Sequence, residues 1–303
     1  MSWHGVFPYL ATPLTKDGRV DPAALAELVE RVIAAGVHGV TPLGSTGEFP
    51  YLSPAAREQT IAVTVDVTRR RVPVVAGIGG FSASDAMRQA EVAARLGANG
   101  LLCILQAYFP LSDAEVIAYF RAVAETTDLP IVVYHHPELC HVRLSRRLAE
   151  SLASIPTVAY IKDASGSLDL CMISPRLAEL GLSVFAATAL SPTASMLFGA
   201  VGWMSGPACV FPEESVRMFE LCRSGRWEAA AELERAMESV LTAFRRLGPA
   251  ASVKALLRAD GLDVGLPAPP VDGGDEDLGE ALHLARQRLA AVGRAPGKPI
   301  AAA

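Results

Sequence analysis

Lys162 closes a run of apolar and β-branched residues, Val158–Ile161, and the turn-forming residues Asp163–Gly166 follow it. Such a run is typical of a strand buried on both faces, so an amine at its carboxyl end either points into a pocket or reaches solvent. Burial lowers the pKa of a lysine, and the neutral amine can attack a ketone to form a Schiff base. We therefore take Lys162 as a candidate nucleophile, with a solvent-exposed lysine at a strand end as the alternative.

Two other predicted strands end in residues that suit the same chemistry. The segment Gly44–Gly47 places Ser45 and Thr46 between two glycines. Glycine lets the backbone turn its N–H groups inward, so this loop could hold a carboxylate with N–H groups and two hydroxyls. Tyr134 ends the strand before the one that carries Lys162, where its phenol could relay protons at an imine carbon. Taken alone, the Gly44–Gly47 segment also fits an ordinary turn, and Tyr134 also fits a tyrosine that only packs in the core.

The elements that must position these residues alternate regularly between strand and helix. Apolar runs predict strands at 5–11, around 40, and at 72–76, 100–105, 129–134, 158–162, 182–186 and 201–205. Segments of helical period separate them, and capping preferences predict N-caps at Asp21, Ser53, Ser82 or Ser84, and Ser112. Eight such βα units indicate an α/β protein with a (β/α)8 TIM barrel over residues 1–225.

A different pattern follows the predicted barrel. Residues 227–247, 251–260 and 276–292 are predicted helices with no strand between them. We expect residues 226–296 to form a helical C-terminal extension and 297–303 to be a disordered tail. Lys254 lies in the second of these helices, where no strand end presents it, so we interpret it as a surface or packing lysine.

Composition limits the possible classes of function. The chain has 303 residues, of which 51% are hydrophobic, and a net charge of −5 with no long basic block, which argues against nucleic acid as a partner. Five cysteines form no CxxC pair, as expected of reduced thiols in the cytoplasm. We see no signal-like N-terminus and no apolar stretch long enough for a membrane span, so the expected location is cytoplasmic, without a membrane partner.

Further residues near the predicted strand ends are candidates for contact with substrate. Two histidines follow Tyr134, and because successive strand residues face opposite sides, at most one should enter the pocket. We choose His135 as the substrate-binding candidate, and we add Ala187 and Met204 at the ends of the last two strands. His141 lies nearby, but no carboxylate or cysteine spacing supports a metal site, so we predict none.

The strings Gly-Ser-Thr-Gly-Glu at 44–48 and Ile-Lys-Asp-Ala-Ser-Gly at 161–166, with Tyr134 between them, resemble the dihydrodipicolinate synthase / N-acetylneuraminate lyase family. The resemblance covers nearly the whole chain, from Gly5 to Leu262. It implies a class I aldolase or lyase that needs no cofactor. Lys162 would form a Schiff base with pyruvate or another 2-oxo acid, and the C3–C4 bond to an aldehyde would then form or break.

The same resemblance implies roles for other residues. Tyr134 would shuttle protons, Ser45 would join its relay, and Ser45, Thr46 and Gly44 would hold the 2-oxo acid carboxylate. In the synthase branch a further tyrosine reaches the relay of the neighbouring subunit, and Tyr108 stands at that place, with packing as the alternative role. A homo-oligomer, dimer or tetramer, is expected. Glu48 is expected to be structural, holding its loop through backbone N–H groups.

The chain departs from the two named branches near the second substrate. Leu139 stands where the synthase branch has an arginine, and Arg143 would need a backbone shift to replace it, which argues against dihydrodipicolinate synthesis. The segment 185–190 is nearly apolar, which argues against a sugar acid. Together with the Gly-Ser-Thr-Gly-Glu-Phe-Pro string at 44–50, this apolar segment resembles 4-hydroxy-2-oxoglutarate aldolases. Hydratase-aldolases that release aromatic aldehydes are another branch with a less polar pocket. A dehydratase of a sugar-derived 2-oxo acid, or a regulatory protein that only binds a keto acid, are the remaining alternatives.

Overall fold

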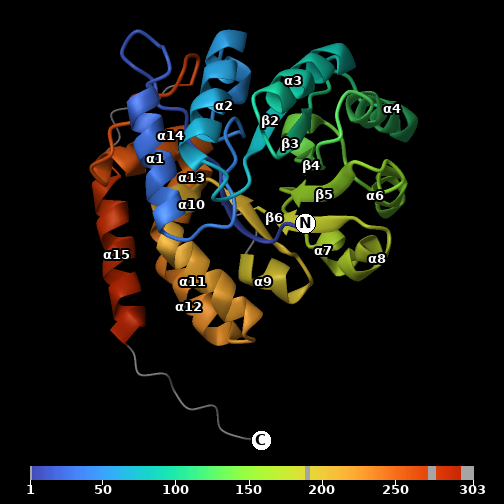
Figure 1. Ribbon diagram of the computed structural model, residues 1–303. Coiled ribbons are helices and arrows are strands. Elements are labelled where there is room, and N and C mark those ends of the chain that lie inside the picture. The colour runs from blue at the N-terminus through green and yellow to red at the C-terminus, as the bar shows by residue number, and fades with distance from the viewer. Residues whose placement is uncertain (1, 188–191, 272–277, 295–303) are drawn as a thin grey trace, which may run out of the picture.

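Seven parallel strands form one curled sheet in the computed structural model, which describes residues 2–187, 192–271 and 278–294 (Figure 1). Their spatial order is β1-β7-β6-β5-β4-β3-β2, so each strand after the first lies beside its neighbour in sequence. The strands are β1 (Gly5–Pro8), β2 (Val75–Gly80), β3 (Gly100–Leu105), β4 (Ile131–His135), β5 (Val158–Asp163), β6 (Ser183–Ala186) and β7 (Gly202–Ser205).

The eighth parallel position, predicted around Val40, lies between β1 and β2 and closes the TIM barrel. It pairs through two single bridges, Tyr9 with Thr41 and Val40 with Val74, instead of a continuous ladder. Proline has no N–H to donate, so Pro42 continues the pairing only through its carbonyl, which accepts from the Gly77 N–H at 2.9 Å. The barrel predicted from the sequence is therefore confirmed, with one of its strands reduced to a short paired segment.

The helices that follow the strands cover the outside of the barrel (Figure 1). They are α1 (Pro22–Ala34), α2 (Pro54–Thr68), α3 (Ala83–Arg95), α4 (Asp113–Ala124), α6 (Arg146–Leu152), α8 (Ser174–Glu179), α9 (Pro192–Leu197) and α11 (Pro212–Arg223). Shorter turns of helix are η1 (Phe49–Tyr51), α5 (Pro137–Cys140), α7 (Asp169–Met172) and α10 (Pro207–Val210). The predicted caps Asp21, Ser53 and Ser112 each accept backbone N–H bonds at the start of their helices.

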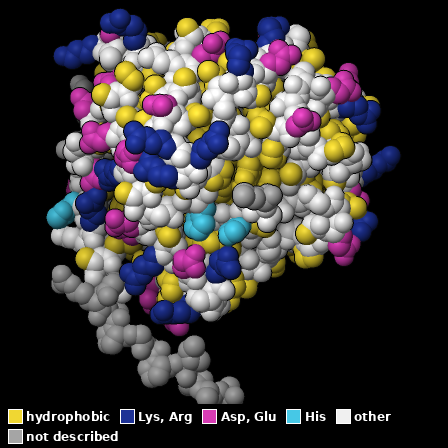
Figure 2. All heavy atoms as spheres, viewed as in Figure 1, with side chains coloured by type: hydrophobic (Ala, Val, Ile, Leu, Met, Phe, Trp, Pro, Cys, Tyr) yellow, Lys and Arg dark blue, Asp and Glu magenta, His cyan; other side chains and the backbone are white. Residues whose placement is uncertain are grey.

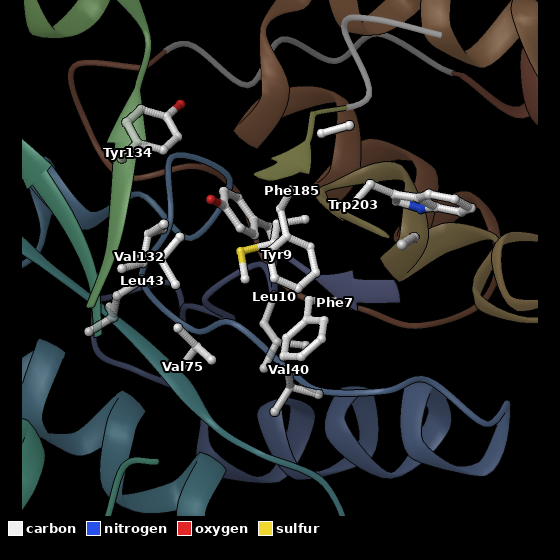
Figure 3. Packing of buried hydrophobic residues seen from close by; sticks show 14 of the residues in the cluster. Phe7, Tyr9, Leu10, Val40, Leu43, Val75, Val132, Tyr134, Phe185 and Trp203 are labelled. Carbon is white, nitrogen blue, oxygen red and sulfur yellow. The ribbon is translucent and has the colours of Figure 1, made fainter. Parts of the chain in front are cut away.

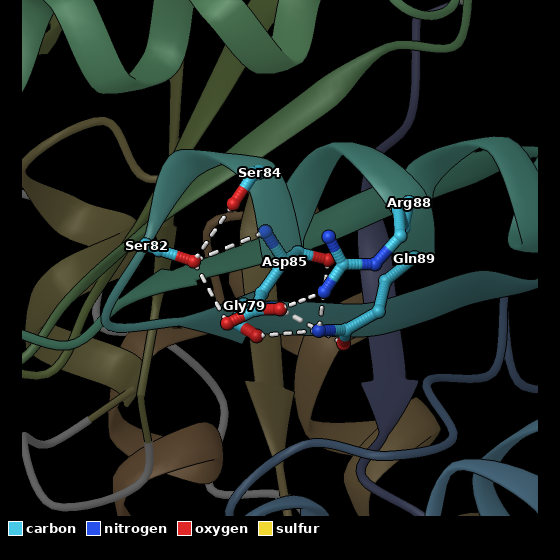
Figure 4. A network of polar contacts seen from close by, with 6 residues as sticks. All are labelled: Gly79, Ser82, Ser84, Asp85, Arg88 and Gln89. Carbon is cyan, nitrogen blue, oxygen red and sulfur yellow. Dashed lines mark hydrogen bonds and ion pairs between the residues drawn. The ribbon is translucent and has the colours of Figure 1, made fainter.

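A compact polar network fixes the start of α3 (Figure 4). Of the two candidate caps, Ser82 is the one used: its hydroxyl accepts from the Asp85 N–H at 3.2 Å and lies 2.7 Å from the Asp85 carboxylate. One turn later, the Gln89 amide donates to the Gly79 carbonyl at 2.8 Å and accepts from its N–H at 3.3 Å. The helix is thus tied to the end of β2 by side-chain bonds as well as by its cap.

The C-terminal extension consists of α12 (Trp227–Ala236), α13 (Glu238–Leu247), α14 (Pro249–Ala259) and α15 (Gly279–Arg294). The single helix predicted over 227–247 is wrong, because the chain leaves helical geometry at Met237 (φ −87°, ψ 2°). The break lets α12 and α13 both contact α15. Part of the predicted 276–292 helix, and the tail at 297–303, lie outside the described residues.

Side chains of the barrel interior pack below the carboxyl ends of the strands (Figure 3). Phe7 and Phe185 are fully buried and meet edge to face at 5.3 Å between ring centroids, with Val40, Val75 and Val132 nearby. This packed floor leaves the strand ends as the place where polar groups gather.

The outer surface mixes hydrophobic and charged side chains. On the face in Figure 2, hydrophobic side chains gather near the middle, and basic and acidic side chains are interspersed around them. Of the helices in the described ranges, none combines the length and apolar character needed to cross a membrane.

Candidate active site

The register between β4 and β5 places Lys162 and Tyr134 side by side on the inner face of the barrel. Tyr134 pairs with Lys162, and His135 pairs with Asp163, so these two pairs face opposite sides of the sheet. The Lys162 side chain is only 4% exposed, and its Nζ lies 4.5 Å from the centroid of the Tyr134 ring. The strand-end lysine therefore points into the protein, and the solvent-exposed alternative does not hold.

Burial changes the acid–base chemistry of this amine. Desolvation lowers the pKa of Lys162 from its ordinary 10.5 to about 7, and the charges of Asp163 and Cys140 oppose this only in part. The Asp163 carboxylate is turned away, because it lies 2.8 Å from His135 Nδ1 and accepts from the Ser165 N–H at 3.0 Å. At neutral pH a large fraction of the Lys162 amine is thus unprotonated and nucleophilic.

Tyr134 is the phenol beside that amine. Burial raises its pKa above the usual range, and the nearby Ser45 side chain opposes this rise in part. The phenol stays protonated at neutral pH and is already linked to the loop that follows the eighth parallel position. The structure therefore brings together Lys162, Tyr134 and Ser45, which come from three separate segments of the sequence.

The Gly44–Gly47 loop is a tight turn between two residues in the left-handed region. Leu43 (φ 62°) and Glu48 (φ 59°) flank it, and the Gly47 N–H donates to the Gly44 carbonyl at 3.0 Å. A Cβ on Gly47 would lie 2.9 Å from the backbone nitrogen of Leu43, so the turn needs glycine there. Thr46, at 1% exposure, is buried within this loop.

A buried ion pair anchors this loop to the C-terminal extension. Lys254 Nζ lies 2.5 Å from Glu48 Oε2, and both side chains are fully buried. Lys254 also donates to the Leu266 carbonyl at 2.9 Å, and the Ala268 N–H donates to Glu48 Oε1 at 2.5 Å. Glu48 thus bonds a backbone N–H, but that of Ala268 in the extension and not one of its own loop. Lys254 is not a surface lysine, and the sequence does not indicate its pairing with Glu48, because the two lie in distant segments.

The two histidines have different surroundings. His135 lies between Asp163 and the Leu144 N–H, which donates to its Nε2 at 3.0 Å. Both ring nitrogens are engaged inside the protein, which disagrees with our prediction that His135 contacts substrate. His136 is half-buried with its ring centroid 6.0 Å from that of Tyr134, and burial, followed by the charge of Lys162, lowers its pKa. His136 is therefore the histidine that lies on the side of Lys162.

Tyr9 is a second phenol beside the amine, and the sequence analysis did not single it out. It follows β1 and is 1% exposed, and Lys162 Nζ lies 5.0 Å from its ring centroid. Figure 3 shows Tyr9 and Tyr134 above the packed floor of the barrel. Its place at the carboxyl end of the first predicted strand was the available signal, because such ends carry the chemistry of parallel barrels.

The remaining predicted residues divide into buried and exposed groups. Met204 is fully buried on β7 in register with Phe7, and Ala187, 4% exposed, follows β6. Tyr108 is 80% exposed and packs edge to face on Phe109, so it lies outside the buried site formed by its own chain. Leu139 is exposed in α5.

His, Cys, Asp and Glu side chains are the groups that commonly hold a metal in proteins. Within residues 2–187, 192–271 and 278–294, no cluster of three or more such side chains occurs. All five cysteines are buried and free. Around Lys162 the structure places two phenols and the end of the Gly44–Gly47 loop.

Comparison with known proteins agrees with this geometry. Residues 2–287 match the sequence model of the dihydrodipicolinate synthetase family. An uncharacterized DapA-like lyase of Halobacterium salinarum is 35% identical over 281 residues, which is 92% of each chain. The 4-hydroxy-tetrahydrodipicolinate synthase of Methanopyrus kandleri is 32% identical over 299 residues, 94% of this chain and 96% of that one. The structure of the corresponding synthase from Methylacidiphilum fumariolicum matches with a TM-score of 0.87 at 26% identity, over 96% of this chain and 99% of that chain.

Proposed function

Because the chain belongs to the dihydrodipicolinate synthetase family and is a lyase of the class I aldolase type, we propose that Lys162 forms a Schiff base with pyruvate or a longer 2-oxo acid. The main support is that the Lys162 amine is buried and has a lowered pKa. Nζ is buried between two phenol rings, at 4.5 and 5.0 Å from their centroids, and its pKa is lowered to about 7. An amine in this state has the lone pair that attack on a ketone requires.

The proposed reaction begins when neutral Nζ adds to the C2 carbonyl of the 2-oxo acid. Loss of water from the carbinolamine gives a protonated imine, which withdraws electrons from C3. In the cleavage direction the C3–C4 bond breaks, an aldehyde leaves, and C3 remains as an enamine; in the synthetic direction the enamine adds to the aldehyde. Protonation of the enamine and hydrolysis of the imine then release pyruvate and restore the amine.

Tyr134 is the proposed proton carrier in these steps. Its phenol lies beside the amine, and its pKa is raised by burial, so it can donate a proton to the departing water or to an aldehyde oxygen. Ser45 interacts with this phenol and can pass the proton onward. Removing the hydroxyl with Tyr134→Phe should slow the reaction by about 100-fold or more, the usual contribution of general acid–base catalysis.

The Gly44–Gly47 loop is the proposed binding site for the carboxylate of the 2-oxo acid. N–H groups of the loop and the hydroxyls of Ser45 and Thr46 supply donors to a negative charge. The loop is held from behind by the Glu48–Lys254 pair, which keeps these donors in place before substrate arrives. Preorganised donors cost little to align, and this favours binding of the acid.

The surroundings of the site favour a less polar second substrate. Ala187, which follows β6, and Met204, near the end of β7, are buried apolar residues, and Phe185 belongs to the packed floor of the barrel. Arg143 is exposed, which supports the argument against dihydrodipicolinate synthesis made from Leu139. An aldolase of 4-hydroxy-2-oxoglutarate type or an aromatic hydratase-aldolase suits this lining better than a sugar-acid dehydratase does. The identity of the aldehyde is best tested by pairing pyruvate with semialdehydes, glyoxylate, sugar aldehydes and aromatic aldehydes.

Borohydride trapping with pyruvate tests the proposed Schiff base. We expect a stable reduced adduct on the peptide that contains Lys162 in the wild-type protein, and no adduct in Lys162→Ala. Lys16→Ala is the matched control, because Lys16 is exposed and should leave trapping unchanged. Binding of pyruvate without any reducible adduct would favour a keto-acid-binding regulatory protein, and an adduct that persists in Lys162→Ala would reject the role of Lys162.

We also propose that the chain works as a homo-oligomer. Phe81, Tyr108 and Phe109 expose 66%, 80% and 72% of their surface, on the loops that follow neighbouring strands β2 and β3. Exposed aromatic clusters of this kind favour a protein partner, and a second copy would bring Tyr108 toward another site. Light scattering should report a dimer or tetramer, and Tyr108→Ala with Phe109→Ala should shift it toward monomer; a monomeric wild-type protein would reject this proposal.

The five free, buried cysteines support a proposed cytoplasmic location, where thiols stay reduced. Cell fractionation of the native host would test it. Recovery of the protein from an oxidising compartment would contradict it.

A further inference from the structure

Tyr9 is held rigidly between the amine and the Gly44–Gly47 loop. Its backbone N–H donates to the Ser205 carbonyl at 2.9 Å, and Cys209 Sγ donates to its carbonyl at 2.8 Å. Its ring lies against Gly44, where an added Cβ would be 2.6 Å from Tyr9 Cδ2. The ring also faces Lys162, whose Nζ lies 5.0 Å from the centroid. Tyr9 thus borders both the imine position and the proposed carboxylate site.

The hydroxyl of Tyr9 is buried without a partner. The side chain is 1% exposed, and in the part of the chain that the structure describes no hydrogen-bond partner reaches its Oη. A buried polar group left unpaired destabilises a folded protein, so such groups are rare and need an explanation. In Figure 3 the hydroxyl is turned toward the side of the barrel on which Tyr134 stands. The missing partner would therefore be a molecule bound in the same space.

The chemistry of this hydroxyl limits what that molecule can offer. Burial raises the pKa of Tyr9 well above its ordinary value, and the neighbouring Tyr134 and Cys140 raise it further. The phenol therefore remains protonated and acts as a hydrogen-bond donor toward an oxygen acceptor, best toward a charged one. In an imine on Lys162, the carboxylate carbon is bonded directly to the imine carbon. It must lie beside Nζ, in the region that Tyr9 borders.

We propose that Tyr9 is a specificity-determining residue that donates a hydrogen bond to the carboxylate of the 2-oxo acid held on Lys162. This inference rests on the proposed Schiff-base function and adds a donor to those of Ser45 and Thr46. Tyr9 carries no proton in the reaction, unlike Tyr134. Its hydroxyl therefore acts on the affinity for the acid more than on the rate of the chemical steps.

Tyr9→Phe tests this role because it removes the hydroxyl and keeps the ring that packs on Gly44. Borohydride trapping is measured over a range of pyruvate concentrations in the wild-type protein, in Tyr9→Phe and in the control Tyr51→Phe, whose ring is 47% exposed. We expect the half-saturating concentration to rise about 10-fold or more in Tyr9→Phe, as for a lost bond to a charged group, with a smaller change in the maximal rate. The control should match the wild-type protein.

Two further readouts separate this role from a structural one. Pyruvamide carries a neutral amide in place of the carboxylate, so Tyr9→Phe should weaken its trapping much less than that of pyruvate. Without ligand, the melting temperature of Tyr9→Phe should equal or exceed that of the wild-type protein, because an unpaired buried hydroxyl has been removed. A lower melting temperature would mean that Oη has a partner inside the protein, which would overturn the inference.

The outcomes distinguish this inference from the proposed function. Equal half-saturating pyruvate concentrations in the wild-type protein and in Tyr9→Phe overturn the role of Tyr9 alone. If Tyr9→Phe raises the half-saturating concentrations of pyruvate and of pyruvamide by the same factor, the assignment of Tyr9 to the carboxylate is overturned. Absence of trapping in the wild-type protein overturns the Schiff-base function and the role of Tyr9 with it.

Discussion

Replacing Lys254 by methionine removes the cation that faces Glu48 and leaves a buried carboxylate without its counter-charge. Both side chains have no exposed surface, and Nζ lies 2.5 Å from Oε2. Breaking a buried pair by removing one partner costs about 3–5 kcal/mol, because the remaining charge stays desolvated. In a chain of this size each kcal/mol lowers the melting temperature by roughly 2 °C, so we expect a decrease of about 6–10 °C.

The same change should also weaken substrate binding. Glu48 directly follows the Gly44–Gly47 loop and holds its left-handed φ of 59° while bonding the Ala268 N–H. Without Lys254, the carboxylate gains by turning toward water, and the loop then loses its anchor to the C-terminal extension. We expect Lys254→Met to raise the KM for pyruvate, although Lys254 is not placed among the groups that touch substrate.

Chemical and thermal unfolding followed by circular dichroism measure the stability effect. Three variants form a cycle: Lys254→Met, Glu48→Gln, and the two combined. The double variant has no unpaired charge, so it should be more stable than Lys254→Met alone. Lys16→Met is the exposed control and should stay within about 0.5 kcal/mol of the wild-type protein.

The reasoning would be refuted by two results. If Lys254→Met lowers the free energy of unfolding by less than about 1 kcal/mol, the pair contributes no more than an exposed ion pair does. That result would contradict the expected loss, which was worked out from the burial of both side chains. A double variant no more stable than Lys254→Met would show that lost packing, and not the unpaired charge, is responsible.

Three other predictions concern the amine and its surroundings. Trapping at limiting pyruvate should rise with pH through about 7 and level off above it, because the amine of Lys162 is neutral above its pKa; a midpoint near 10 would contradict the burial effect. Asp163→Asn should move that midpoint to lower pH, because the Asp163 charge raises the pKa of Lys162, and an unchanged midpoint would show that the two groups do not interact. Gly44→Ala should raise the KM for pyruvate, because its Cβ would lie 2.6 Å from the Tyr9 ring; an unchanged KM would show that the loop adjusts freely.

Much of the fold and part of the site could be predicted because local patterns carry them. Lys162, Tyr134 and Ser45 each end an apolar run, and parallel strands bring their carboxyl ends to one edge. Register then decides which side chains meet, and the pairing of Tyr134 with Lys162 has no signature in the sequence. The same register turned His135 toward Asp163, where our choice between the two histidines was wrong.

Other features depend on contacts between distant segments. The Ala268 N–H that bonds Glu48 is 220 residues away in sequence, and nothing local to either residue indicates the contact. The break at Met237 lies in a segment of good helix formers and reflects packing of two helices on α15. Tyr9 was missed because an aromatic residue in an apolar strand is normally a packing residue, and its place at the strand end does not by itself separate the two roles.

The short eighth strand keeps its backbone bonds to both neighbouring strands. Val40 bonds Pro73 and Val75 on one side, and Thr41 bonds Pro8 and Leu10 on the other, in each case through its own N–H and carbonyl. Opening this segment therefore requires bonds on both sides to break, and the amide protons of Val40 and Thr41 should exchange with deuterium slowly. The Gly44–Gly47 loop begins directly after this segment, so the loop extends from backbone that is clamped on two sides.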